Sequence, residues 1–274
     1  MKKIFIIAGS GLLLAILIFK FGRTTEPVKP VVTNAAKSVP SFDIQGFISE
    51  QTRLLSASAK LRLDSLSSNP DNLSKTRTLA GFWKDSSKAF EPYIFYTAEA
   101  AKLDNSEKNV TFAAQLFLEA LRMEQNEAKL EWESAVAIDL FQRAIQLNPQ
   151  NDDLKIGLGS CYIYGRGRSG DPQETMKGIQ EILAVARKDS TNMKAQLMLG
   201  VGGLVSGQYD KAIVRFTKVI EKEPANLEAV AYLADAYAAS GNKEEAIKWY
   251  TISKRLANNP HYSEEVDTRI KSLQ

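Results

Sequence analysis

Two stretches near the C-terminus resemble each other at a fixed offset of 34 residues. The first runs from Met198 to Asn226 and the second from Tyr232 to Pro260. Residues of the same kind recur in both stretches: Ser206-Gly207 and Ser240-Gly241, Ala212-Ile213 and Ala246-Ile247, Phe216 and Tyr250. A fixed period of this length predicts a stack of similar units, because one unit alone cannot bury its apolar face.

Each unit is predicted to consist of two antiparallel helices joined by a tight glycine turn. Gly207 and Gly241 mark the turns, and Pro224 ends the first unit where the next helix must begin again. The second helix of the first unit carries an apolar stripe at helical spacing: Ala212, Ile213, Phe216, Val219 and Ile220. The chain is therefore expected to be all-α.

This pattern closely resembles the tetratricopeptide repeat (TPR) family, whose repeat has the same length. Family positions are matched in the first stretch by Leu199, Gly200, Ala212, Phe216 and Pro224, and in the second by Leu233, Ala234, Tyr237, Ala246 and Tyr250. Gly203 replaces the family tyrosine, and the second proline, Pro260, comes two residues late. The resemblance implies a right-handed α-solenoid of antiparallel helix hairpins.

Weaker copies of the unit precede these two stretches. Pro149 lies 75 residues before Pro224, which is two periods plus a seven-residue insertion. Between them, a first helix is matched by Leu158, Gly159 and Tyr162, and an earlier second helix by Ala137, Phe141 and Ala144. The resemblance therefore covers roughly residues 78–259 and is strong only from Leu154 onward.

The N-terminus carries an apolar run that predicts a membrane anchor. Lys2 and Lys3 precede a charge-free run from Ile4 to Phe19. The run is long enough to span a bilayer when it extends over residues 4–21 and Lys20 snorkels to the interface. A cleaved signal peptide is the alternative, although no small residues at cleavage spacing come after the run.

The orientation of this anchor rests on few charges, because Lys20 and Arg23 follow the run much as two lysines precede it. An N-terminal anchor preceded by lysines usually exports the part of the chain on its C-terminal side. We expect a bacterial single-pass protein of the cytoplasmic membrane with a periplasmic soluble part; a cytoplasm-facing soluble part is the alternative. The expected division is an anchor (1–23), a proline-containing tether (24–41), a helical segment (42–77), a TPR array of about four hairpins (78–262) and a capping helix (263–274).

Charge and composition argue against several classes of function. Beyond residue 26, basic and acidic residues are equal in number and no basic cluster stands out, so no nucleic-acid partner is expected. Cys161 and His261 are the single cysteine and histidine of the chain. This excludes a histidine-cluster metal site and disfavours a histidine-based triad, so we expect no catalytic residue, metal or cofactor.

TPR arrays are binding scaffolds, in which the first helices of successive repeats line a groove for a peptide or a partner helix. Carried over position by position, the resemblance implies these groove residues: Ile156, Ser160, Ile163, Tyr164, Leu197, Met198, Val201, Leu204, Val205, Ala231, Tyr232 and Asp235. Most are apolar, which suits an apolar segment or amphipathic helix of another protein. The basic and amide residues with which some family members hold a C-terminal carboxylate are missing, so no such clamp is expected.

The expected function is a membrane-tethered protein-interaction scaffold, acting as an assembly factor or chaperone accessory, and not an enzyme. One alternative is a groove filled by the chain's own side chains. Another is a structural role through self-association. The least supported alternative is an enzyme with a site on the solenoid.

The insertion contains the sequence "YGRGRSGDP", Tyr164 to Pro172, which reads as a lengthened turn between two helices. Asp171 is the expected N-cap, Pro172 the first helical residue, and Glu174 the return partner of a capping box. This leaves Arg166 and Arg168 on a loop that ordinary repeats lack. They are either solvated or a basic contact for an acidic partner or lipid headgroups.

Overall fold

The computed structural model describes residues 41–274, so the predicted anchor, its apolar run over residues 4–21 and nearly all of the tether lie outside the described residues. Within the described range every regular element is helical, which confirms the all-α prediction. The elements are α2 (Ile44–Leu54), α3 (Ala57–Ser67), α4 (Asn72–Gly81), η1 (Phe82–Ser87), α5 (Phe90–Asp104), α6 (Glu107–Met123), α7 (Glu127–Leu147), α8 (Asp152–Tyr162), η2 (Ile163–Gly167), α9 (Pro172–Lys188), α10 (Met193–Val205), α11 (Tyr209–Lys222), α12 (Leu227–Ala239), α13 (Lys243–Ala257) and α14 (Pro260–Leu273). None of these helices is both long and apolar enough to cross a membrane.

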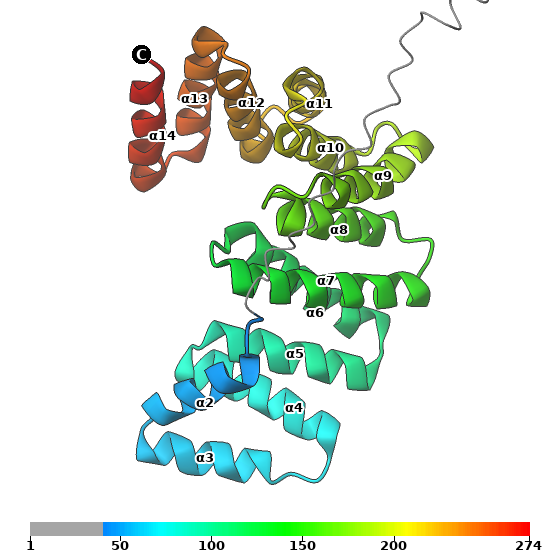
Figure 1. The fold of residues 1–274 in the computed structure, drawn as a ribbon, viewed down its shortest axis with the longest axis vertical. Coiled ribbons are helices and arrows are strands. Elements are labelled where there is room, and N and C mark those ends of the chain that lie inside the picture. The colour runs from blue at the N-terminus through cyan, green and yellow to red at the C-terminus, as the bar shows by residue number, and fades with distance from the viewer. Residues whose placement is uncertain (1–40) are drawn as a thin grey trace, which may run out of the picture. The chain divides into compact units, whose positions relative to one another are not determined.

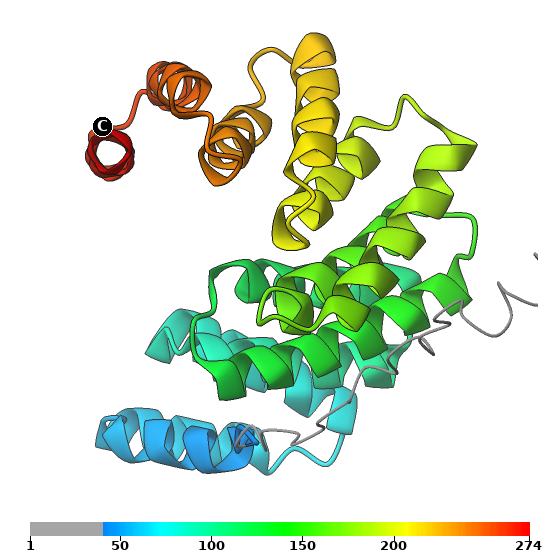
Figure 2. The same cartoon turned by 45° about the horizontal axis from the view of Figure 1, so that its top comes forward.

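Consecutive helices pair into hairpins, and each hairpin packs on the next (Figure 1). The pairs are α4–α5, α6–α7, α8–α9, α10–α11 and α12–α13. Five hairpins thus occupy residues 72–257, where the sequence suggested about four from residue 78. The last helix, α14, packs against α13, and Figure 2 shows the two side by side and nearly end-on.

Helix starts follow from short polar side chains that accept hydrogen bonds from the amides of the first turn. The residues that do so are Asp43, Ser56, Asp71, Ser106, Asn126, Asn151, Asp171, Asn192, Asn226, Asn242 and Asn259. The turns within the last two hairpins pass through Gly207 at φ +72° and Gly241 at φ +84°. Only glycine adopts this left-handed backbone without steric cost, so these residues fix where each hairpin reverses.

The core of the array runs through the hairpins from α5 to α12, with Phe117, Phe141 and Phe216 fully buried. Glycines let the helices approach closely. A Cβ atom at Gly159 would lie 2.7 Å from the carbonyl oxygen of Gly178, so α8 and α9 meet backbone to backbone. A separate cluster around Trp83 joins α2, α3 and α4 to η1.

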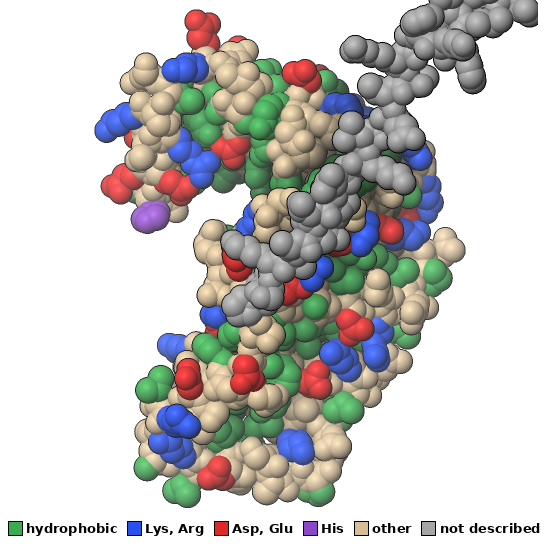
Figure 3. Space-filling view, viewed as in Figure 1, with side chains coloured by type: hydrophobic (Ala, Val, Ile, Leu, Met, Phe, Trp, Pro, Cys, Tyr) green, Lys and Arg blue, Asp and Glu red, His purple; other side chains and the backbone are tan. Residues whose placement is uncertain are grey.

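Charged side chains of both signs are interspersed over the face seen in Figure 3, without a patch of one sign. The same mixture holds along the sequence beyond residue 26, where basic and acidic residues balance. A cationic surface of the kind that binds nucleic acid is therefore not a feature of this face.

Candidate functional site: a groove across the first helices of the hairpins

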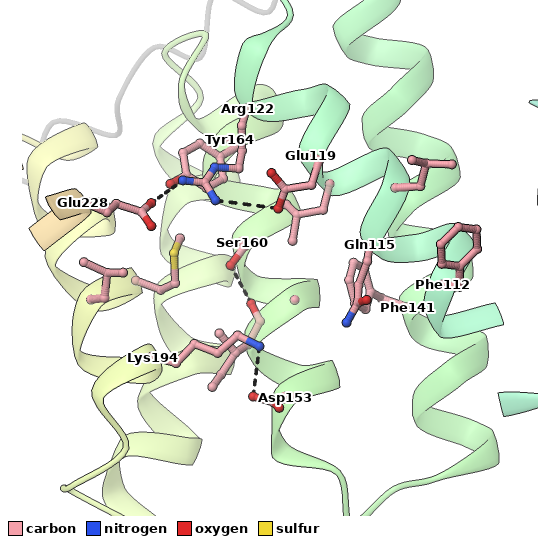
Figure 4. Close-up of a pocket in the computed structure, with 16 residues that line it drawn as sticks. Phe112, Gln115, Glu119, Arg122, Phe141, Asp153, Ser160, Tyr164, Lys194 and Glu228 are labelled. Carbon is pink, nitrogen blue, oxygen red and sulfur yellow. Dashed lines mark hydrogen bonds and ion pairs between the residues drawn. The ribbon is translucent and has the colours of Figure 1, made fainter. Parts of the chain in front are cut away.

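A cavity of about 390 Å³ lies across α6, α8 and α10 and reaches the first turn of α12 (Figure 4). These are first helices of successive hairpins, which the resemblance predicted to line the groove. Its apolar wall is formed by Phe112, Leu116, Leu118, Phe141, Ile156, Gly157, Leu197 and Met198. Its polar groups come from Gln115, Glu119, Arg122, Asp153, Ser160, Tyr164, Lys194 and Glu228.

One wall is built by an aromatic ring that passes over a glycine. A Cβ atom at Gly157 would lie 2.5 Å from Cζ of Phe141, so only a glycine in α8 lets the α7 ring reach the cavity. Phe112 lines the cavity from the α6 side (Figure 4), and 52% of its surface is exposed. An exposed aromatic residue at the edge of a cavity is available for contact with a ligand.

One end of the cavity is closed by charged and phenolic side chains. Arg122 of α6 pairs with Glu228 of α12, lies 3.7 Å from Glu119, and its guanidinium carbon is 5.5 Å from the centre of the Tyr164 ring. Burial disfavours the charge on Arg122, but Tyr164, Glu228 and Glu119 together raise its pKa. The guanidinium thus stays charged and links two helices that are far apart in sequence.

The phenol of Tyr164 continues the row of side chains that closes this end of the cavity. Its oxygen lies 3.1 Å from that of Tyr232, and the Tyr232 ring stacks on Phe216 with centres 5.6 Å apart. Burial raises the pKa of Tyr164, and the neighbouring Tyr232 adds to the rise. The phenol therefore stays protonated and acts as a structural hydrogen-bonding group.

The opposite end of the cavity is polar and more exposed to solvent. Lys194 and Asp153 form an exposed ion pair at 3.0 Å. Ser160, which also lines the cavity, donates its hydroxyl to the carbonyl oxygen of Ile156 at 2.7 Å, so its proton is already used within α8. The exposed Gln115 side chain of α6 faces this part of the cavity (Figure 4).

The structure divides the twelve groove residues expected from the sequence. Five of them line the cavity: Ile156, Ser160, Tyr164, Leu197 and Met198. Seven do not: Ile163, Val201, Leu204, Val205, Ala231, Tyr232 and Asp235. Ile163 and Val201 are buried in the core, and Asp235 accepts hydrogen bonds from Tyr250 and Arg269.

The placement of Ile163 has a clear cause. A Cβ atom at Gly178 would lie 2.7 Å from its Cγ1, and one at Gly202 would lie 3.2 Å from its Cδ1. The two glycines thus admit the Ile163 side chain between α9 and α10. Its position in the hairpin resembles that of a groove residue, but the small neighbours draw it into the core.

Sequence reasoning missed the contribution of α6 to the cavity. That helix supplies Phe112, Gln115, Leu116, Leu118, Glu119 and Arg122. The groove positions that the resemblance implies lie in the three C-terminal repeats, where the family pattern is clearest. The spacing of Phe112, Leu116 and Glu119 along one helical face was the signal that could have extended the groove to α6.

The lengthened turn folds back onto the preceding hairpin. Arg166 donates from Nε to Glu131 at 2.7 Å, and Arg168 donates to the carbonyl oxygen of Arg122 at 3.1 Å and to that of Glu124. Arg168 therefore caps the C-terminal end of α6. Both arginines make contacts within the chain, where the sequence suggested solvated groups or contacts to a partner or lipids.

The N-cap predicted for α9 is confirmed, but the capping box is wrong. Asp171 accepts hydrogen bonds from the amides of Gln173 at 2.9 Å and Glu174 at 3.2 Å. The amide of Asp171, however, donates to the carbonyl oxygen of Arg166 at 3.0 Å, and the Glu174 side chain pairs with Lys177. The folded loop has already satisfied the amide that a capping box would use.

The single cysteine of the chain lies in the core. Cys161 is fully buried in α8, and burial raises the pKa of its thiol. A thiol held in its protonated form is a packing group and not a nucleophile.

Comparison with known proteins gives matches in sequence and in structure. Residues 204–264 match the tetratricopeptide repeat family. BBSome complex member BBS4 of Bos taurus is 30% identical over 112 residues, which cover 41% of this chain and 20% of that protein. The matched part thus spans about a fifth of the length of this relative.

Among solved structures, the crystal structure of MamA protein is 16% identical, with a TM-score of 0.45, and the match covers 69% of this chain and 94% of that one. The structure of YrrB, described as a TPR protein with an unusual peptide-binding site, is also 16% identical, with a TM-score of 0.43, and the match covers 77% and 99%. Residues 204–264, from the end of α10 to the first turns of α14, are the part of the chain that matches the tetratricopeptide repeat family model.

Proposed function

We propose that this chain is a protein-interaction scaffold whose groove receives an apolar segment or amphipathic helix of another protein. The observation that carries the proposal is the cavity across α6, α8 and α10, with Phe112 exposed at its edge. The volume of about 390 Å³ falls in the range of ligand pockets, roughly 300–1,000 Å³. Several hairpins contribute, so the surface exists only when the repeats stack.

The chemistry of the groove indicates how a partner would lie in it. Apolar side chains of α6, α8 and α10 form the floor, and a partner would bury its own apolar side chains there. Arg122 and Glu228 close one end, whereas the exposed pair of Lys194 and Asp153 leaves the other end accessible. A helix or extended segment would therefore enter from the Lys194 end, with polar groups facing outward.

We further propose that the scaffold is tethered to the cytoplasmic membrane by residues 1–23 and held off it by residues 24–41. The support is the charge-free run behind Lys2 and Lys3 and the prolines that come after it. With a periplasmic soluble part, the protein would serve as an assembly or chaperone accessory factor. A reporter enzyme that is active only outside the cytoplasm, fused after Gln274, tests the orientation: an inactive reporter contradicts it.

Photocrosslinking from within the native membrane tests the scaffold function. The photoreactive residue p-benzoylphenylalanine replaces Phe112 at the groove or, as a matched control, Val214 on α11. Val214 is 66% exposed and does not line the cavity, so it reports random encounters. We expect one protein partner to crosslink from position 112 and not from position 214. Crosslinks from position 112 to this chain alone would instead indicate self-association.

A further inference from the structure

A second hollow of about 390 Å³ lies next to the groove, between the start of α5, the C-terminal half of α6 and the first turns of α7. Four carboxylates line it: Glu91, Glu119, Glu124 and Glu133. It adjoins the groove, because Leu116 and Glu119 line both. A ligand segment in the groove could therefore place one side chain in the hollow.

Glu133 of α7 is the unusual group of this hollow. It is only 2% exposed, and its Oε2 atom has no hydrogen-bond partner in the described chain. A buried polar atom without a partner is costly, and native structures contain few of them. The carboxylate end of Glu133 thus has an unfilled bonding capacity at the wall of an open hollow.

The cations near this carboxylate are already bound to other groups. Lys129 pairs with Glu91, and Arg168 donates to the two carbonyl oxygens at the end of α6. Glu124 is held by its own turn, since its Oε1 accepts hydrogen bonds from the amides of Gln125 at 2.7 Å and Asn126 at 2.6 Å. The carboxylates therefore outnumber the cations around the hollow.

The rim of the hollow is apolar. Phe90 is 44% exposed and Met123 is 79% exposed, and both line the hollow. An apolar rim above a cluster of carboxyl groups matches a ligand with an aliphatic stem and a cationic end, which is the structure of a lysine or arginine side chain. A metal ion does not fit, because no group of histidine, cysteine and carboxylate ligands in residues 41–274 has the arrangement that one needs.

We propose that the hollow beside Glu133 binds a basic side chain, lysine or arginine, of the partner whose apolar segment lies in the adjoining groove. The aliphatic stem would pass between Phe90 and Met123. The cationic end would donate a hydrogen bond to Glu133 and be attracted by the carboxylates of Glu91 and Glu124. This inference rests on the proposed scaffold function and specifies the partner: an apolar segment with a basic residue at one end.

Protonation of Glu133 couples to such binding. Burial raises its pKa to about 8, Glu124 and Glu91 add to the rise, and Lys129 and Arg168 oppose it. Near pH 7 the empty site is therefore mostly protonated, and a cation must displace that proton. Affinity for a cation should rise by up to about tenfold per pH unit below the pKa and level off above it.

The test uses the full chain and two probes. The first is N-acetyl-lysine N-methylamide. The second is its norleucine analogue, whose side chain has the same four carbon atoms but no charge. Methyl NMR of ¹³C-labelled methionine separates the sites, because Met123 lines the hollow and Met198 lines the groove. We expect the lysine probe to shift the Met123 signal and the norleucine probe to leave it unchanged. Shifts confined to Met198, or equal shifts with both probes, overturn the proposal.

Matched variants identify the carboxylate. Glu133→Gln keeps the shape of the side chain, and Glu127→Gln removes the same charge from an exposed position of the same helix. We expect Glu133→Gln to weaken the lysine probe about tenfold and abolish the pH dependence, and Glu127→Gln to change neither. Unchanged signals of Met176 and Met193 show that each variant is folded. Equal affinity of the lysine probe for both variants overturns the inference. Crosslinking from position 112 tests the proposed scaffold function separately.

Discussion

The last two hairpins, α10–α11 and α12–α13, reverse the chain through short glycine turns, whereas the α8–α9 hairpin reverses it through a long turn. In the former, the chain reverses at Gly207 or Gly241, and the next amide bonds back within its own hairpin, as Gln208 does to the carbonyl oxygen of Gly203 at 2.7 Å. In the latter, η2 and the residues up to Asp171 reach the preceding hairpin through Arg166 and Arg168. A short turn closes one unit, whereas the long turn joins two.

This difference bears on both candidate binding sites. Arg168 holds the carbonyl oxygens of Arg122 and Glu124 at the end of α6, and the side chains of those two residues line the groove and the acidic hollow. Gly165 supports the same junction, because a Cβ atom there would lie 3.0 Å from Cβ of Ser134 in α7. The long turn thus holds in place the C-terminal end of α6, whose side chains line both the groove and the hollow beside Glu133.

The largest effect is expected where α8 and α9 touch through their backbones. Gly159→Val should lower the free energy of unfolding by about 3 kcal/mol, because its side chain would meet the Gly178 carbonyl and Ile182. Urea denaturation measures the loss. Gly81→Ala in α4, where a Cβ atom meets nothing within 4 Å, should raise stability by about 0.5–1 kcal/mol. A similar loss in both variants would mean that close approach is not the cause.

A smaller effect is expected from removing the contacts between the long turn and the end of α6. Arg168→Met removes two hydrogen bonds to the last carbonyl groups of α6 and should cost about 1–3 kcal/mol. Hydrogen exchange should rise at the end of α6 and stay unchanged in α10–α13. Arg166→Met is the control, because its pair with Glu131 is exposed and worth about 0–1 kcal/mol. Uniformly faster exchange over all hairpins would contradict a local role.

The smallest effect is expected in a short turn. Gly241→Ala forces an alanine to adopt φ +84° and should cost about 1 kcal/mol, as measured by thermal unfolding. Exchange should rise only in α12 and α13, because the amides of Gly241 and Asn242 donate within that hairpin. Faster exchange in α8 or α9 would show that the short turns also link hairpins, and the comparison would fail.

The repeat period and the turn glycines were enough to predict the helix hairpins, because both depend on local sequence. The N-cap at Asp171 could be predicted for the same reason. The role of Glu174 could not, since the amide of Asp171 is taken by the carbonyl oxygen of Arg166, and that contact arises only when the loop folds.

Most of the groove was equally hidden from the sequence, since five of the sixteen residues that line it were expected. The contribution of α6 was missed because the family pattern is weak there, and Ile163 was misplaced because Gly178 and Gly202 admit it to the core. The buried Glu133 has no sequence signal at all. Its environment depends on Glu91, Glu124 and Arg168, which come together only in the folded chain.

The central claim, that the cavity across α6, α8 and α10 receives a partner segment, is tested most directly by blocking it. Gln115 is exposed and lines the cavity, so Gln115→Trp fills the space without disturbing the core. Gln173→Trp, at an exposed site on α9 away from the cavity, is the control. Calorimetry with the peptide identified by crosslinking should show at least a tenfold weaker affinity for Gln115→Trp and no change for Gln173→Trp. Unchanged affinity in a folded Gln115→Trp variant would contradict the account.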